Sequence, residues 1–121
     1  MKRILTAFIL ISSATVYSQS STKTLLQGKW QSTDDKTNIL WFEGDLRKET
    51  NDGKNWDSEE FVVAKACQNE SDASTTSENG ATDFISCIES DLCWEVTSIS
   101  ASELTLTYIA SGNMLTYKRV K

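Results

Sequence analysis

The sequence predicts an all-β protein that forms an eight-stranded antiparallel up-and-down barrel, and three observations lead to this fold class. Helical periodicity is hard to find beyond the first eighteen residues. The pattern that recurs instead is a short run of alternating or β-rich residues closed by a turn. Eight such strands in succession can close on themselves and leave no exposed edge. An open sandwich of two sheets is the alternative architecture.

The N-terminal residues have the pattern of a secretory signal peptide. Lys2 and Arg3 form a positive region, a mostly apolar stretch follows up to Ile11, and small and polar residues lead to a cleavage point. The apolar stretch is shorter than the roughly 20 residues that a membrane span needs. We therefore expect an exported chain, secreted or periplasmic, that does not insert into a membrane after cleavage. Its two parts are a signal peptide, residues 1–18, and one domain, residues 19–121.

The expected domain is acidic. Both basic residues of the signal peptide are lost on cleavage, which leaves 10 basic and 17 acidic residues and a net charge of −7. Such a surface is repelled by phosphates and by anionic lipids. We therefore expect no nucleic-acid partner and no role at a membrane surface.

The first four strands are separated by polar or glycine-containing turns. Asp34-Asp35-Lys36 forms the first turn, and Gly44-Asp45 makes a tight hairpin. Asp52-Gly53 is a strong hairpin signal because both residues tolerate a positive φ. The strands expected from these turns are residues 28–32, 37–43, 46–51 and 56–67.

The other four strands follow a polar segment, residues 68–82, which has no large apolar side chain and which we expect to be a mobile loop. Glu89-Ser90-Asp91 and Ser100-Ala101-Ser102 are the next turns, and Ser111-Gly112-Asn113 forms a hairpin loop. The strands expected between these turns are residues 83–88, 92–99, 103–109 and 114–120.

Alternation predicts which side chains face the barrel interior, because successive strand residues point to opposite faces. Leu104, Leu106 and Tyr108 share one face of their strand. In the strand over residues 37–43 both faces are apolar, so two alternatives remain for its inward pair: Ile39 with Trp41, or Leu40 with Phe42.

At Gly28-Lys29-Trp30 the sequence resembles the lipocalin-like family, in particular its small secreted bacterial members. The matching segments are Leu25 to Trp30, Trp41-Phe42-Glu43, Asp91-Leu92-Cys93-Trp94 and Leu115-Thr116-Tyr117-Lys118-Arg119. The resemblance implies that the tryptophan of the Gly-X-Trp motif packs at the closed end of the barrel, and that an arginine of the last strand lies across it. Gly28, Trp30 and Arg119 would form this closure.

Three cysteines allow one disulfide and one free thiol, and export would place them where disulfides persist. We favour Cys67 with Cys93, because this bond would tie the entry of the polar loop to the sheet. Cys67 with Cys87 is the second choice. In the favoured pairing Cys87 would be a buried thiol with no redox role.

Catalysis and metal binding have little support in the sequence. The chain has no histidine, so no Ser-His or Cys-His pair can form, and it has no Gly-X-Ser-X-Gly motif. The oxygen ligands of residues 51–57 do not match an EF-hand. We therefore expect a protein that is not an enzyme and that uses no cofactor and no metal.

The aromatic residues of the strands are the main candidate site. One hypothesis is a binding protein that holds a small apolar molecule in the barrel mouth, against inward rings. The alternative is that these rings fill the barrel core. The candidate lining residues are Trp41, Phe42, Trp56, Phe61, Phe84, Trp94 and Tyr108.

A second hypothesis uses the loop over residues 68–82. Its acidic side chains, on a chain of net charge −7, would contact a basic protein, and the chain would act as a non-enzymatic interaction or inhibitor protein. In either case we expect a monomer.

Overall fold

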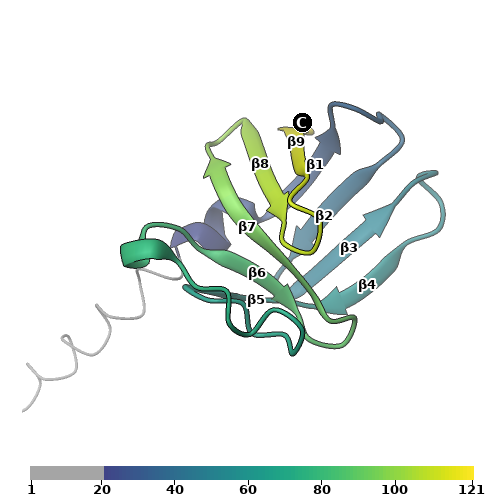
Figure 1. Cartoon of the computed structure of the whole chain (residues 1–121). Helices are drawn as coiled ribbons and strands as arrows, with labels where there is room; N and C mark the ends of the chain where they lie inside the picture. Colours follow the sequence, from purple (N-terminus) through teal and green to yellow (C-terminus); the bar gives the residue numbers. More distant parts are fainter. Residues whose placement is uncertain (1–20) are drawn as a thin grey trace, which may run out of the picture.

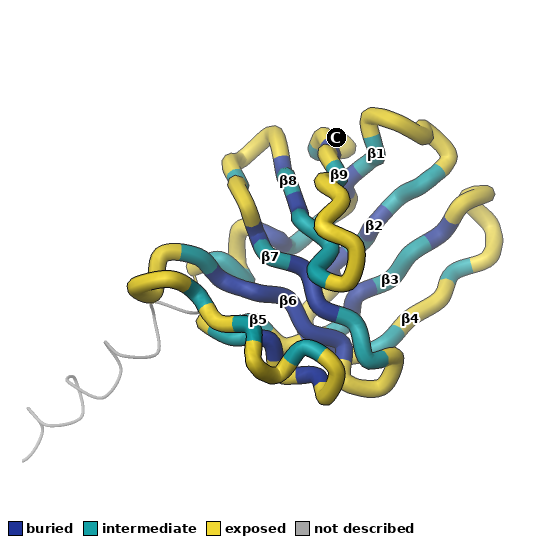
Figure 2. Tube along the Cα trace, in the orientation of Figure 1, coloured by how far each residue is buried: buried dark blue, intermediate teal, exposed yellow. Residues whose placement is uncertain are grey.

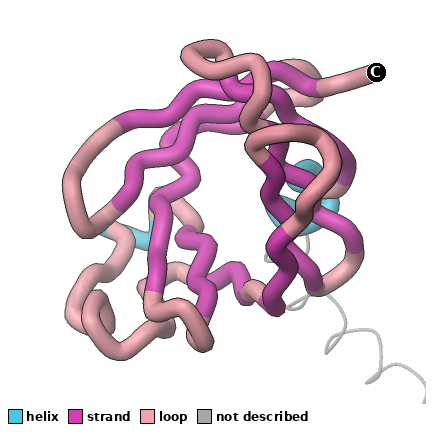
Figure 3. Tube along the Cα trace, turned by 90° about the vertical axis from the view of Figure 1, so that its right-hand side faces the viewer, coloured by secondary structure: helices cyan, strands magenta, loops and turns pink. Residues whose placement is uncertain are grey.

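One antiparallel sheet of nine strands curls into a nearly closed barrel in the computed structural model, which describes residues 21–121 (Figures 1 and 3). The sheet order is β4-β3-β2-β1-β9-β8-β7-β6-β5. The predicted all-β, up-and-down fold is confirmed. The predicted signal peptide, residues 1–18, lies outside the described residues. The strands are β1 Gly28–Ser32, β2 Ile39–Glu43, β3 Leu46–Thr50, β4 Asp57–Glu60, β5 Val62–Ala64, β6 Phe84–Cys87, β7 Leu92–Ile99, β8 Glu103–Tyr108 and β9 Met114–Arg119.

The strand count differs from the prediction because the expected fourth strand, residues 56–67, is two strands. β4 pairs with β3, and β5 pairs with β6. Phe61 lies between them, and its backbone N–H donates to the carbonyl of Asp45 at 3.0 Å. The chain over residues 57–64 therefore changes its pairing partner from β3 to β6 at Phe61. This exchange brings the two ends of the sheet together.

The exchange leaves a seam in the barrel wall, which we define as the gap between β4 and the turn over residues 88–91. β4 has β3 as its one strand partner, so its other edge faces this turn without a ladder of backbone bonds. The side chain of Glu59 crosses the seam: its carboxylate accepts hydrogen bonds from Ser90 Oγ at 2.7 Å and Ser90 N at 3.3 Å.

The core fills the inside of the barrel. Leu104 and Leu106 are fully buried, as their alternation predicts. Leu40 and Phe42 form the inward pair of β2, which settles the alternative that the sequence left open. Figure 2 shows that the buried positions are concentrated along the strands while the turns are exposed. The deeply buried members of this core are Leu26, Trp30, Leu40, Phe42, Phe61, Ile85, Cys87, Trp94, Val96, Leu104, Leu106 and Tyr117.

In the described part of the chain, residues 21–121, two short helical segments accompany the sheet. Residues 21–26 form a helical turn ahead of β1, which the sequence did not predict, and η2 spans Glu78–Gly80. Leu26, in the first of these, is fully buried in the barrel core. Among residues 21–121, no helix has the length and apolar character needed to cross a membrane.

Candidate functional site

One end of the barrel is closed by an arginine that covers a tryptophan. Arg119 and Trp30 are opposite each other in the pairing of β1 with β9, and the guanidinium carbon lies 4.1 Å from the indole centroid. The indole is fully buried, and its Nε1–H donates to the carbonyl of Leu26 at 2.8 Å. A contact of this kind contributes about 0.5–2 kcal/mol. This is the arrangement that the family resemblance implies.

Arg119 also binds backbone carbonyls that the strands leave free at this end. Its Nη1 and Nη2 donate to the carbonyls of Gln27 at 2.6 Å and Leu25 at 2.7 Å, and its Nε donates to that of Ala101 at 2.7 Å. The guanidinium thus joins the segment before β1 to the turn between β7 and β8. With its donors used in this way, this end of the barrel has a structural role.

The aromatic candidates divide into two groups. Phe42 and Phe61 lie inside, with ring centroids 5.1 Å apart. Trp94 and Tyr108 also belong to the interior, 5.8 Å apart. These four rings pack against one another and against the aliphatic core, as in the alternative of a filled barrel.

The prediction that Trp41 and Trp56 line the interior is wrong. Because Leu40 and Phe42 point inward, Trp41 must point outward, where its ring meets Trp56 edge to face at 5.6 Å. Lys29 and Lys48 place their ammonium groups over the Trp41 ring at 4.5 Å and 4.3 Å, respectively. The two tryptophans therefore cover the outer face of the barrel.

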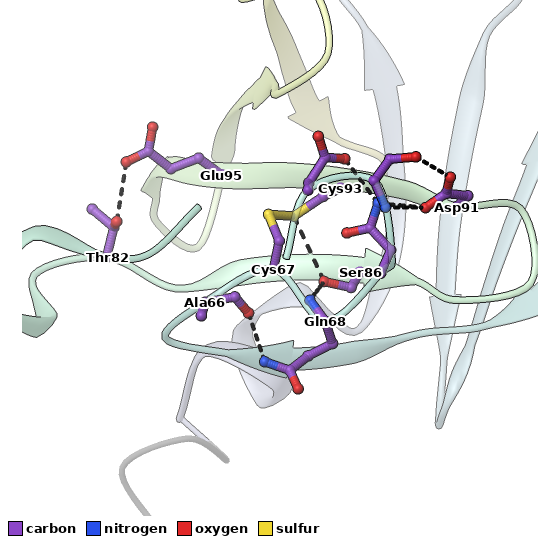
Figure 4. The surroundings of a disulfide bond; sticks show 11 residues. Ala66, Cys67, Gln68, Thr82, Ser86, Asp91, Cys93 and Glu95 are labelled. Carbon is purple, nitrogen blue, oxygen red and sulfur yellow. Dashed lines mark hydrogen bonds between the residues drawn. A yellow bond between two sulfur atoms is a disulfide. The ribbon is translucent and has the colours of Figure 1, made fainter. Parts of the chain in front are cut away.

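Phe84 is likewise outside the barrel core, in a second cluster with Cys67 and Cys93. The disulfide between these cysteines is present, as predicted, with an S–S length of 2.01 Å, and Cys87 is a buried free thiol. Figure 4 shows the disulfide between the start of the polar loop and β7, beside Ser86. The Ser86 hydroxyl accepts a hydrogen bond from Gln68 N at 2.8 Å.

The polar loop, residues 68–82, contains hydrogen bonds of its own that its composition did not predict. Asn69 is fully buried, and its side-chain amide donates to carboxylates of Asp72 at 2.8 Å and Asp91 at 3.0 Å. Ala66 forms an isolated bridge with Thr76. Polar side chains that bond to one another order this segment without an apolar core, and its composition alone gave no sign of that.

The barrel interior also holds a buried charge. Arg47 is 7% exposed on the inner face of β3, opposite Phe42, and its guanidinium carbon lies 4.2 Å from the Trp94 centroid. Its one hydrogen bond within residues 21–121 joins Nη2 to Glu49 Oε1 at 3.3 Å, and Nε has no partner. A guanidinium has five N–H donors. This side chain is therefore short of acceptors in a place where unpaired donors are costly.

A cavity of about 240 Å³ opens beside Arg47 at the seam. Three carboxylates line it together with two serines, so the lining has one positive and three negative side chains. The lining residues are Arg47, Asp57, Ser58, Glu59, Glu89 and Ser90.

A second hollow of about 500 Å³ adjoins this seam cavity and shares three of its lining residues, Ser58, Glu59 and Glu89. We call it the outer groove. It adds the apolar side chains of Leu46, Phe61, Val62 and Ile88 and the polar side chains of Glu60 and Ser86. Val62 and Ile88 are 42% and 54% exposed, which is unusual for large apolar residues beside a hollow.

The interior groups near Arg47 stay neutral over a wide pH range. Burial raises the pKa of the Cys87 thiol to about 12, against a smaller opposing effect of Arg47. Burial also raises the pKa of the Tyr117 hydroxyl to about 12. Neither group is an ionised nucleophile or base at neutral pH. Within residues 21–121, no three acidic or cysteine side chains gather as metal ligands.

Sequence reasoning missed Arg47, Glu59 and Ser90, although a signal for Arg47 was present. The Gly44-Asp45 hairpin sets Phe42 opposite Arg47, so an inward Phe42 requires an inward Arg47. That step needed the face of β2, which the sequence left open. The contact of Glu59 with Ser90 joins residues 31 positions apart and had no local signal.

These features define the class of the protein: a small antiparallel β-barrel, nearly closed, with one end closed by an arginine over a tryptophan and a charged cavity at its seam. Comparisons with protein-family models, with curated proteins and with solved structures found no match to the chain.

Proposed function

We propose that the chain is an exported, non-enzymatic binding protein that holds a small organic molecule in the seam cavity against Arg47. The observation that supports this most directly is the buried guanidinium with unused donors at the wall of a cavity. An oxygen acceptor on a ligand would complete its hydrogen bonding. The resemblance to lipocalin-like proteins also favours a binding role.

The geometry changes the expected character of the ligand. A purely apolar molecule in the barrel centre would have to displace Phe42, Phe61 and their neighbours, which are packed together. A molecule at the seam instead meets charged groups first. We therefore move the proposed ligand from the barrel centre to the seam and give it at least one polar group.

The test is a screen of small carbonyl compounds by NMR, followed through the Arg47 Nε–H and Trp94 indole signals. Compounds that bind as proposed shift both signals in the wild-type chain. Arg47→Met should abolish the shift of the Trp94 signal, because it removes the donors while keeping an apolar stem over Trp94. Lys48→Met is the matched control, since it removes the neighbouring charge from the outer face of the same strand.

Two results would contradict the proposal: no compound shifts these signals in the folded chain, or the Trp94 shift persists in Arg47→Met. Circular dichroism and urea unfolding establish that each variant is folded. The Glu49 side chain, which loses its partner in this variant, is 34% exposed, so water can solvate its carboxylate and Arg47→Met is expected to fold.

Capture of a basic protein by the loop over residues 68–82 stays a prediction. Glu70 and Glu78 are exposed there and available to a partner. The Asp72 carboxylate instead accepts a hydrogen bond from Asn69 inside the loop. The charge available for a partner on this loop is thus smaller than its sequence indicated, and the seam is the better-supported site.

A further inference from the structure

The seam has more negative charge than its own arginine can balance. Asp57, Glu59 and Glu89 line the cavity with Arg47, and Arg47 is already in contact with Glu49. A carboxylate oxygen pair can accept about four hydrogen bonds, whereas Glu59 accepts two from Ser90 and is also the hydrogen-bond partner of the Cys87 thiol. The seam carboxylates therefore have acceptor capacity and charge left for a cation.

Arg47 supplies the second, independent observation. It is buried, lines the same cavity, and its guanidinium makes one hydrogen bond within residues 21–121, to Glu49, although it has five N–H donors. A bare metal ion or a simple ammonium ion would satisfy the carboxylates and leave the other donors unpaired. An organic cation that also has an acceptor oxygen fits both the seam carboxylates and Arg47.

The outer groove supplies a place for an apolar body. Val62 and Ile88 are exposed at its wall, and Phe61 lies between the strands that form its floor. The groove shares Glu59 and Glu89 with the cavity, so one molecule can occupy both. Its volume of about 500 Å³ is in the range of small-molecule sites, about 300–1,000 Å³.

We infer that the ligand is an apolar amine with a carbonyl group: its ammonium lies among the seam carboxylates, its carbonyl oxygen accepts from Arg47, and its apolar side group lies in the outer groove. This inference rests on the proposed function and names the ligand class for the same site. An α-amino amide is the simplest molecule with these three parts.

The experiment compares two probes that differ in one charge. Phenylalaninamide has the ammonium, the carbonyl and the aromatic body, whereas N-acetylphenylalaninamide is neutral. Isothermal titration calorimetry is carried out on the full chain with its disulfide formed, at pH 6, where an α-amino group with a pKa of about 7.7–8.0 is protonated. We expect phenylalaninamide to bind at least about tenfold more tightly, and its affinity to fall as salt is raised.

Two variants test whether the difference in affinity between the two probes arises at the seam. Glu59→Gln should weaken phenylalaninamide several-fold and leave N-acetylphenylalaninamide unchanged, because only the charged probe uses the carboxylate. Glu103→Gln is the matched control: it removes an exposed carboxylate on β8 that pairs with Lys118, away from the seam. It should change neither affinity.

The outcomes separate the inference from the proposed function. If both probes bind equally and Arg47→Met weakens both, the inference on the amine is overturned and the binding site at Arg47 stands. If Glu103→Gln weakens phenylalaninamide as much as Glu59→Gln does, the ammonium responds to the overall acidity of the chain and the inference is again overturned. If neither probe binds the folded wild-type chain, the inference is overturned, and the NMR screen of carbonyl compounds decides the proposed function separately.

Discussion

Two arginines of this barrel have different roles. Arg119 lies over Trp30 and uses its Nε, Nη1 and Nη2 on three carbonyls, so it has a structural role. Arg47 lies over Trp94 in a similar way, but its Nε has no partner. The same side chain stacked on the same type of ring therefore closes the barrel at Trp30 and is a candidate binding group at Trp94.

Gly28 is required for two reasons that act together. Its φ of +112° lies in a region that L-residues rarely adopt, and a Cβ there would lie 2.7 Å from Arg119 Nη1. Gly28→Ala should lower the free energy of unfolding by about 2–5 kcal/mol, from backbone strain and crowding combined. Urea unfolding followed by tryptophan fluorescence measures this change.

Gly112 supplies the control, because its φ is +77° and a Cβ there meets no atom within 4 Å. Gly112→Ala should cost only backbone strain, about 1 kcal/mol. Equal losses in the two variants would show that the approach of Arg119 contributes nothing.

At the scale of elements, the ribbon of β4 and β5 shows what alternation can and cannot predict. Glu59 and Phe61 lie on the inner side, as one continuous strand would place them, yet the pairing partner changes between them. Side-chain alternation depends on the local backbone, whereas pairing depends on which strand lies beside it. The sequence therefore predicted one continuous strand here and missed the seam.

The disulfide fixes the polar loop to the outer face of β7. It closes 26 residues, for which the chain-entropy model gives a stabilisation of about 3–4 kcal/mol. The double replacement of Cys67 and Cys93 by Ser should lower the free energy of unfolding by this amount, and proteolysis should then cleave the loop first. Cys87→Ala, which leaves the disulfide intact, should keep the loop protected.

Cleavage of the loop at the same rate with and without the disulfide would contradict this account. In that case the hydrogen bonds of Asn69 and Asp91 alone would hold the segment.

At the scale of the whole molecule, two buried groups, the Cys87 thiol and the Tyr117 hydroxyl, predict how stability changes at high pH. The pKa values of Cys87 and Tyr117 are about 12 in the folded chain, against 9.0 and 10.0 for the free groups. Above pH 9 the unfolded chain therefore loses protons that the folded chain retains. The stabilising contribution is complete below about pH 9 and is lost as pH rises toward 12.

Urea unfolding from pH 8 to pH 11 measures this decline. Lysines also titrate in this range, so the useful comparison is with Cys87→Ala and Tyr117→Phe, which should each flatten the decline. A decline that is identical in wild type and in both variants would show that these groups are not the cause.

The sequence by itself predicted the all-β fold, the positions of the turns, the alternation on β8 and, as the favoured pairing, Cys67 with Cys93. Each of these follows from local chemistry: turn residues, a period of two, and a cysteine at each side of a polar loop. The tertiary structure alone decided that Trp41 and Trp56 face outward, that the ribbon changes partner at Phe61, and that Arg47 meets a cavity at the seam. These outcomes depend on which strands become neighbours when the sheet curls, and contacts between distant residues leave no periodic signal in the chain.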